Sequence, residues 1–133
     1  MARFVLSVGA YVGIVFPLAI LWHLVLFKER YHAFGYFDGD PDLALGLATI
    51  TAQAILLALL YKRIALPGGE MRRALTFGLT LGAFYWTCHV LAFLAKQSTA
   101  QPWAYLVMET GYLSLQFGFY SIALWVIHRP RRG

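Results

Sequence analysis

Four runs of apolar residues, each about as long as a lipid bilayer is thick, constrain what this chain can fold into. They cover residues 4–27, 41–61, 73–96 and 103–127. A helix needs about 20 predominantly apolar residues to cross the hydrocarbon core. The segments between the runs are too short to form another domain. We therefore predict one transmembrane domain over residues 1–133, an all-α polytopic membrane protein built as an antiparallel four-helix bundle.

The composition excludes an ordinary soluble domain. Charged residues make up 13% of the 133 residues and apolar residues 60%, whereas soluble domains contain about 25% charged residues. The net charge of +5 does not indicate a nucleic-acid partner, because the basic residues lie at the ends of the apolar runs. The expected surroundings are therefore the lipid bilayer. A single cysteine, Cys88, excludes an intramolecular disulfide and a multi-thiol metal site.

Local signals predict where the helices bend, begin and approach one another. The first run is about twice the length of a signal-peptide core, so we interpret it as a retained helix with a kink at Pro17. Asp40 is the expected N-cap of the second helix, with Pro41 at its first position. In the third run, Gly78 and Gly82 form a small-xxx-small pattern that lets a neighbouring helix approach.

The distribution of positive charge predicts the orientation in the membrane. Four crossings put both termini on the same side. That side carries eight of the 11 lysines and arginines, namely Arg3, Lys62, Arg63, Arg72, Arg73, Arg129, Arg131 and Arg132. Positive residues are retained in the cytoplasm, so we predict a multi-pass protein of the cell's inner membrane with cytoplasmic termini. An aromatic belt is expected at the opposite interface, formed by Trp22, Tyr31, Tyr36, Trp103 and Tyr105.

Three ionisable residues lie at membrane depth, where such groups are costly and often functional. At about 1.5 Å of rise per residue, Glu109 lies roughly 9 Å inside its interface, His89 roughly 10 Å and His23 roughly 6 Å. All three fall in the half of the membrane away from the termini. The short connection over residues 97–102 fixes the register of the last two helices. It therefore predicts contact between His89 and Glu109.

Further polar residues share a helical face with these groups. Tyr105, Glu109, Tyr112, Gln116 and Tyr120 recur every three or four residues in the fourth run, as do Gly46, Thr49 and Gln53 in the second. Polar faces in a membrane bundle turn inward. The candidate ligand-binding or proton site therefore comprises His23, Gln53, His89, Glu109, Tyr112 and Gln116.

Three interpretations of this polar set are open. The side chains can be interhelical hydrogen bonds that only hold the bundle together. They can instead form a ligand or proton site in which Glu109 and His89 exchange a proton. A haem or metal site using His23 and His89 is a third interpretation, although the spacing does not require it. We assign no catalytic residue, metal ligand or cofactor, and Cys88 lies about 100° around the helix from His89, too far for a nucleophile pair.

Two short segments carry a resemblance to known proteins. They are Leu21-Trp22-His23 through Leu26-Phe27-Lys28 at the end of the first run and Glu109-Thr110-Gly111-Tyr112 in the fourth. In this layout the chain resembles uncharacterised bacterial families of small four-span integral membrane proteins, which are known as domains of unknown function. The resemblance covers most of the chain and implies a membrane location without implying an activity.

Two functions follow as hypotheses. The first is a non-enzymatic accessory or scaffold module that packs with itself as a homo-oligomer or with a larger membrane complex. Its support is a set of small-residue faces, which are Gly9/Gly13, Ala44/Ala48/Ala52, Gly78/Gly82 and Ser114/Gly118. The alternative is a ligand-binding, transport or enzymatic protein with an outward-facing polar site around His89 and Glu109. No nucleotide-binding, serine-hydrolase or zinc-protease motif is present, so the sequence favours the first.

Overall fold

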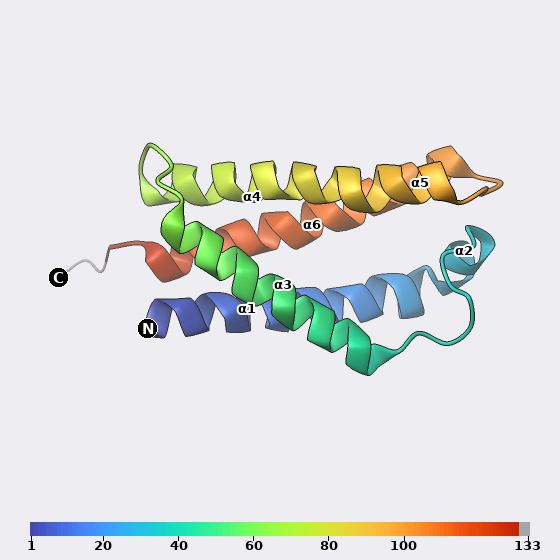
Figure 1. The fold of residues 1–133 in the computed structure, drawn as a ribbon, viewed down its shortest axis with the longest axis horizontal. Coiled ribbons are helices and arrows are strands. Elements are labelled where there is room, and N and C mark those ends of the chain that lie inside the picture. The colour runs from blue at the N-terminus through green and yellow to red at the C-terminus, as the bar shows by residue number, and fades with distance from the viewer. Residues whose placement is uncertain (131–133) are drawn as a thin grey trace.

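The computed structural model describes residues 1–130 and consists of helices and the loops between them, with no strand in this part of the chain (Figure 1). The elements are α1 (Ala2–Ala19), η1 (Ile20–Leu26), α2 (Lys28–Ala33), α3 (Leu43–Arg63), α4 (Glu70–Trp86), η2 (Thr87–Leu91), α5 (Ala92–Lys96) and α6 (Pro102–His128). Continuous segments combine them into four helices long and apolar enough to cross a membrane, which are Ala2–Leu26, Leu43–Arg63, Glu70–Lys96 and Pro102–His128. The predicted all-α four-helix bundle is confirmed.

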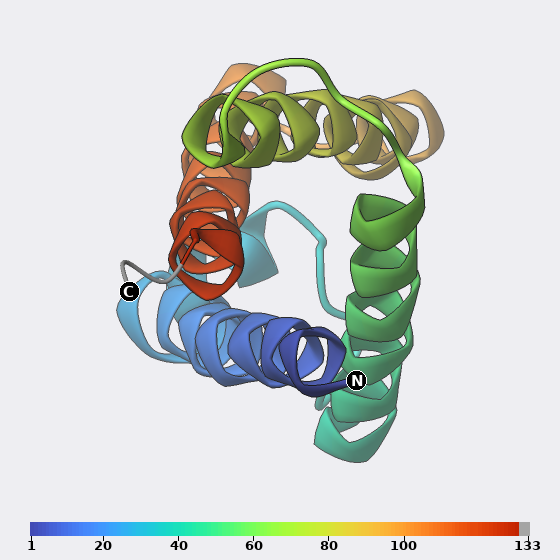
Figure 2. The same cartoon turned by 90° about the vertical axis from the view of Figure 1, so that its left-hand side faces the viewer.

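The helices pack in the order α3, α1, α6, α4, with each contacting the next. Figure 2 looks along the bundle and shows α3 and α4 joined by their connecting loop, with α1 and α6 side by side opposite them. Figure 1 shows α3 crossing α1 at an angle. The start of α1 and the end of α6 lie at the same end, where Ser7 Oγ is 3.2 Å from His128 Nε2.

The start of α3 differs from the sequence prediction. Asp42, and not Asp40, is the N-cap, and its carboxylate accepts a hydrogen bond from the Leu45 amide at 2.9 Å. Pro41 therefore precedes the helix and does not occupy its first position. The reason is geometric, because an N-cap side chain must reach the amide three residues later and Asp42 has the extended backbone (φ −76°, ψ 98°) that allows it.

Two segments of π-helix interrupt the long helices. The kink expected at Pro17 takes the form of a π-helical segment, η1, which begins three residues after the proline and contains His23. The second segment, η2, contains His89. A π-turn inserts one extra residue per turn, which changes the direction of the following side chains, and such turns are frequent at functional sites. Both histidines therefore lie where the helical register changes.

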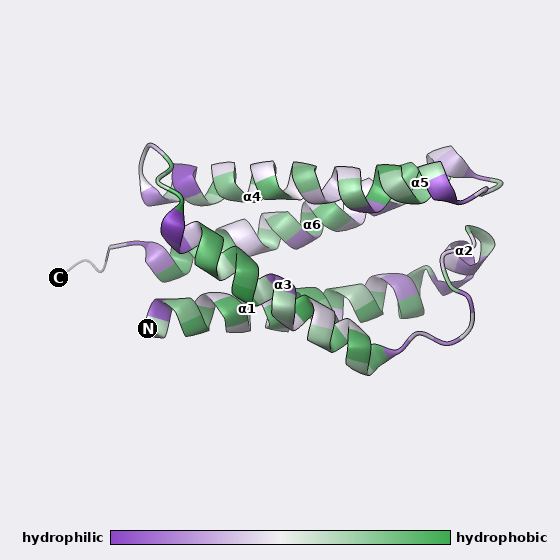
Figure 3. Cartoon of the chain, in the orientation of Figure 1, coloured by the Kyte–Doolittle hydropathy of each residue, from purple (hydrophilic) through white to green (hydrophobic). Residues whose placement is uncertain are grey.

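Small residues let α4 and α6 approach closely. A Cβ added at Gly78 lies within 3.2 Å of the Phe117 carbonyl oxygen, and one added at Gly82 within 3.0 Å of the Phe117 ring. The predicted close approach of another helix at this pair is confirmed. Gly9 and Gly13 differ, because a Cβ at either position meets no atom within 4 Å. The outward faces of the long helices are predominantly apolar, as Figure 3 shows by the green along α1, α3 and α4.

The predicted aromatic belt is mostly wrong. Tyr31 and Tyr105 are fully buried, and Tyr36 is partly buried against the core. Trp103 does point outward and is 77% exposed. The reason is that α2 and the loop after it fold back over the end of the bundle, with Gly35 in the left-handed conformation (φ 72°) at the turn. The tyrosines therefore face the interior and not the lipid headgroups.

Candidate functional site

Glu109 is the centre of a buried cluster of ionisable side chains. Its side chain is fully buried on α6. Oε1 lies 2.9 Å from His23 Nε2, and Oε2 lies 2.9 Å from His89 Nε2. We call His23, Glu109 and His89 the histidine–glutamate cluster. The predicted contact between His89 and Glu109 is thus confirmed, and the structure adds His23 on the opposite side of the same carboxylate.

A tyrosine from α2 completes the hydrogen bonding of the carboxylate. The Tyr31 hydroxyl donates to Oε1 of Glu109 and accepts a hydrogen bond from Trp22 Nε1 at 2.8 Å. Because an indole N–H only donates, the Tyr31 proton must point toward the carboxylate. Burial, and then the charge of Glu109, raise the pKa of Tyr31 above its ordinary value. The phenol therefore stays a donor across the physiological pH range.

The hydrogen-bond partners of His23 fix one proton and leave a second one shared. Its Nδ1 lies 3.1 Å from the carbonyl oxygen of Ala19, which only accepts, so Nδ1 carries a proton. Nε2 faces Oε1 of Glu109, and one proton must lie between these two atoms. Either His23 is an imidazolium beside a carboxylate, or Glu109 is protonated beside a neutral imidazole. Both forms of this pair are electrically neutral.

His89 is bonded on one nitrogen only. Its Nε2 lies 2.9 Å from Oε2 of Glu109, while Nδ1 has no hydrogen-bond partner within residues 1–130. When the His23–Glu109 pair is neutral, Oε2 carries no proton, so Nε2 of His89 is the donor. In both neutral forms of the His23–Glu109 pair, Nδ1 of His89 therefore has a free lone pair. A base held by a carboxylate on one nitrogen with the other nitrogen free is the arrangement that general bases use. The cluster can accept one more proton at this atom.

A cavity of about 400 Å³ lies beside the cluster, between α1, α3, α6 and the segment of α4 and η2. Five of the six predicted site residues line it, namely His23, Gln53, His89, Tyr112 and Gln116. The sixth, Glu109, lies behind the two histidines and bonds both. We call this the triad cavity, after the three residues of the histidine–glutamate cluster. Its remaining lining is largely apolar, and it extends to Asp42 near the loop end of the bundle.

A second hydrogen-bonded group forms the floor of the triad cavity. Gln116 Nε2 donates to the Tyr11 hydroxyl at 2.7 Å, and that hydroxyl donates to Gln53 Oε1 at 3.2 Å. Gln53 Nε2 in turn donates to the Tyr85 hydroxyl at 3.2 Å, and the Tyr85 ring stacks on His89. Side chains from α1, α3, α4 and α6 are thereby joined around one cavity.

Sequence reasoning missed three aromatic residues of the site. The sequence predicts Tyr31 and Tyr36 at the lipid interface, and Tyr85 is not among the predicted site residues. Tyr36 stacks on His23 with ring centroids 5.5 Å apart, and its hydroxyl is 3.4 Å from His89 Nε2. No local signal identifies Tyr31 and Tyr36, because Tyr36 lies in the loop after α2 and its position depends on how that loop packs on the bundle.

The haem interpretation does not fit the histidines. Both ring nitrogens of His23 have hydrogen-bond partners, so neither is free to bind iron without breaking the cluster. Within residues 1–130 no group of three or more His, Cys, Asp or Glu side chains is placed to hold a metal ion. The geometry favours acid–base and hydrogen-bonding chemistry at this site.

Comparison of the chain with protein-family models, with curated protein sequences and with solved structures finds no match. The fold is all-α, and its four long apolar helices are compatible with a small multi-pass membrane protein. The buried histidine–glutamate cluster and the cavity beside it are the features of this fold that bear on function.

Proposed function

We propose that this protein binds a small amphipathic molecule in the triad cavity and exchanges a proton with it at His89. The observation that carries the proposal is the free Nδ1 of a cavity-lining histidine whose Nε2 is held by a buried carboxylate. A cavity of about 400 Å³ lies within the range of small-molecule sites, which are mostly apolar with a few placed polar groups.

The chemistry of the lining defines the class of ligand. The free lone pair of His89 accepts a hydrogen bond, so the polar end of the ligand must donate one, as a hydroxyl or phenol does. Apolar residues of α1, η1 and α3, including Phe16, Ile20 and Ile50, surround the rest of the cavity. An apolar body with one hydroxyl end therefore matches both parts of the lining.

Binding can be tested with a matched pair of probes, 4-heptylphenol and its methyl ether, against the protein in lipid nanodiscs. A ligand present at 100 times its dissociation constant stabilises the folded state by about 2.7 kcal/mol. We expect the phenol to raise the melting temperature and the ether, which cannot donate, to bind at least about tenfold more weakly, a difference of about 1.4 kcal/mol. His89→Phe should remove the preference for the phenol. His32→Phe, on the exposed face of α2, should retain it.

Equal stabilisation by phenol and ether, or none by either, would overturn the proposal. Equal stabilisation would show that the cavity takes apolar molecules without using His89. No stabilisation would leave the cluster as a purely structural hydrogen-bonded core.

We also propose that the protein lies in the cytoplasmic membrane with both termini in the cytoplasm. The support is the eight lysines and arginines assigned to the terminal side against three on the other. The accessory or scaffold role stays a prediction. Fewer small-residue faces are free to contact a partner than the sequence predicts, because Gly78 and Gly82 already pack against α6 of the same chain.

A further inference from the structure

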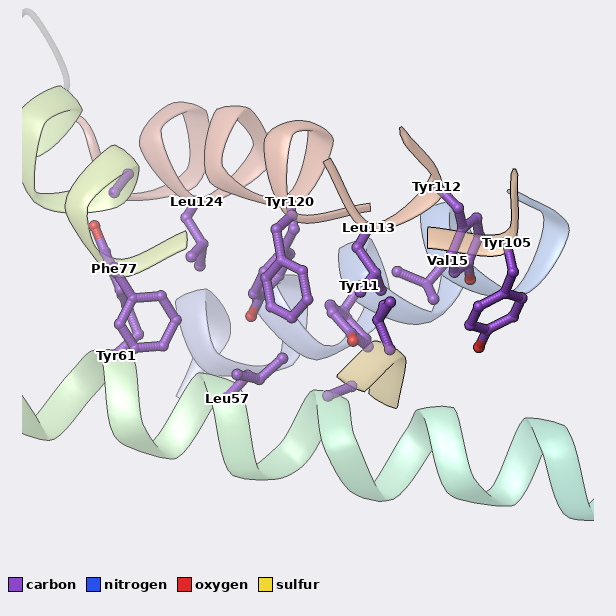
Figure 4. Packing of buried hydrophobic residues seen from close by; sticks show 14 of the residues in the cluster. Tyr11, Val15, Leu57, Tyr61, Phe77, Tyr105, Tyr112, Leu113, Tyr120 and Leu124 are labelled. Atoms are coloured by element: carbon purple, nitrogen blue, oxygen red, sulfur yellow. The ribbon is translucent and has the colours of Figure 1, made fainter. Parts of the chain in front are cut away.

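A groove with a volume of about 450 Å³ runs along the outward side of α4 and α6. Leu79, Ser114 and Gly118 line it and are exposed, so it opens toward the lipid. Figure 4 shows Tyr120 and Leu124 of α6 pointing the other way, toward α3 and into the bundle interior. We call this cavity the outer groove. None of the residues that line it also lines the triad cavity.

The outer groove is about as long as one leaflet of a bilayer is deep. On α4 its lining extends from Leu75 to Trp86, and on α6 from Ser121 to Thr110. Each stretch gives about 16 Å of helical rise. The hydrocarbon core of a bilayer is about 30 Å thick, so one leaflet supplies about 15 Å of it. An acyl chain of a single lipid therefore matches the length of the groove.

A second cavity adjoins the outer groove where α4 begins and α6 ends. It has a volume of about 640 Å³, and Leu75 lines both cavities. Its charged lining residues are Arg72, Arg129 and Glu70. We call it the basic mouth. An apolar groove thus leads directly into a cavity that carries positive charge.

The two arginines of the basic mouth are free to bind an anion, because neither makes an ion pair within residues 1–130. The carboxylate of Glu70 lies 3.8 Å from Arg73, which offsets its negative charge. The guanidinium of Arg129 lies 5.9 Å from the centroid of the Trp125 ring, a cation–π contact beside the mouth. Tryptophan is enriched at the depth of the lipid headgroups. The free positive charge therefore lies where the phosphates of a bilayer lie.

A second copy of the chain matches this surface less well than an anion does. Copies in one membrane share an orientation, so a symmetric pair formed through the outer groove would bring the two basic mouths together at the same depth. Like charges placed opposite each other oppose association. A negatively charged headgroup between the arginines has the opposite effect.

We propose that the basic mouth and the outer groove together bind one anionic phospholipid from the leaflet at this end of the bundle. The headgroup phosphate lies between Arg72 and Arg129, since guanidinium groups match phosphate oxygens with paired N–H donors. One acyl chain lies along the outer groove. The proposal rests on the chain crossing a membrane, and it is independent of ligand binding in the triad cavity.

Native mass spectrometry of the full chain in mild detergent tests the proposal, because it counts the lipids bound to each chain. The probes are phosphatidylglycerol and phosphatidylcholine with identical acyl chains, and glycerol phosphate, which has the charge without the chains. We expect one phosphatidylglycerol to bind at least about tenfold more tightly than phosphatidylcholine. Glycerol phosphate at the same concentration should not displace it.

The role of the arginines is tested by the double variant Arg72→Gln and Arg129→Gln. A basic residue beside anionic lipid changes the affinity by about fivefold. The double variant should therefore bind phosphatidylglycerol about 25-fold more weakly and phosphatidylcholine as before. Arg63→Gln is the matched control, because Arg63 is exposed at the same end of the bundle and lines neither cavity. It should keep the preference for phosphatidylglycerol.

The role of the outer groove is tested by Gly118→Leu. A Cβ at Gly118 meets no atom within 4 Å, so the added side chain occupies the groove without displacing α4. This variant should bind phosphatidylglycerol at least about tenfold more weakly. Gly9→Leu is the control, because Gly9 is exposed on α1, outside both cavities, and a Cβ there also meets no atom within 4 Å. It should bind the lipid like the wild type.

Four results would overturn the proposal. They are equal binding of the two phospholipids, displacement by glycerol phosphate, unchanged phosphatidylglycerol binding in the double arginine variant, and unchanged binding in Gly118→Leu. The mass spectra also report the oligomeric state. A dimer that is lost in Gly118→Leu and kept in Gly9→Leu would assign this face to a second copy and contradict a lipid site.

Melting temperatures identify any variant that fails to fold. Arg72 and Arg129 are exposed, and surface substitutions of this kind change stability little. If Gly118→Leu does not fold, the double arginine variant therefore decides the proposal. Loss of the preference for phosphatidylglycerol at an unchanged melting temperature supports the lipid site, and retention of that preference contradicts it.

Discussion

His23 Nε2 and Glu109 Oε1 lie 2.9 Å apart although 86 residues separate them in the chain. This contact ties α6 to the π-helical segment η1, and the His89 contact ties the same carboxylate to η2. Three helices therefore depend on a single buried side chain.

Replacing Glu109 alone should lower the stability of the fold more than replacing the whole histidine–glutamate cluster. Glu109→Leu leaves two imidazoles without an acceptor, and breaking a buried ionic group in this way costs about 3 to 5 kcal/mol. The triple variant His23→Leu, His89→Leu and Glu109→Leu should be more stable than Glu109→Leu, because an apolar replacement of a complete buried group is often tolerated. Thermal unfolding in mild detergent measures both. A Glu109→Leu variant as stable as the wild type would contradict the role of the cluster.

Tyr31 should make the protein sensitive to alkali. Burial and then Glu109 raise its pKa in the folded state, so above pH 10 the unfolded chain loses this proton while the folded chain keeps it. Stability contributed by the buried phenol is therefore full below pH 10 and is lost as the pH rises. Tyr31→Phe should reduce the loss above pH 10 by up to about 1.4 kcal/mol per pH unit. Unfolding followed from pH 8 to pH 11 tests this, and identical slopes would refute it.

Gly78→Ala and Gly9→Ala should have opposite effects on stability. A Cβ at Gly78 is crowded by Ser121 and the Phe117 carbonyl, whereas one at Gly9 meets nothing within 4 Å. Overpacking costs about 1 to 3 kcal/mol, while replacing an uncrowded helical glycine with alanine gains up to about 1 kcal/mol. Melting temperatures of the two variants give the comparison. A loss at Gly9 equal to that at Gly78 would show that α1 packs against something else.

Asp42→Ala should destabilise the start of α3 by about 1 kcal/mol, because it removes the N-cap bond to Leu45. Asp40→Ala removes the same charge two residues earlier and should have little effect. Amide hydrogen exchange over residues 43–46 reports the local change. Equal exchange in the two variants would mean that the cap does not hold the helix end.

Cysteine labelling tests the orientation. In a Cys88→Ala background, cysteines at the exposed positions Asp38 and Ala65 lie at opposite ends of the bundle. The positive-inside rule predicts that an impermeant reagent labels Asp38→Cys from outside the cell and reaches Ala65→Cys only after the membrane is opened. Labelling of both from outside would contradict the predicted topology.

The four membrane-length helices could be predicted from the sequence, because the length of an apolar run is a local property of each segment. The contact between His89 and Glu109 was also predictable. Only the short connection over residues 97–102 separates their helices, so depth in one fixes depth in the other. The polar face of α6 followed from helical periodicity in the same way, and all six predicted site residues meet at one cavity or behind it.

Tertiary structure alone decided which groups complete the site. Nothing local to His23 indicates that it faces Glu109, because the π-turns that redirect His23 and His89 depend on packing between helices. Tyr31 is a typical interfacial residue by sequence, yet the fold of α2 over the bundle buries it against the carboxylate. Local pattern determines which residues avoid lipid. The pairs of buried residues that share a proton are decided by how helices distant in sequence pack together. A periodicity within one helix gives no information about which helix it contacts.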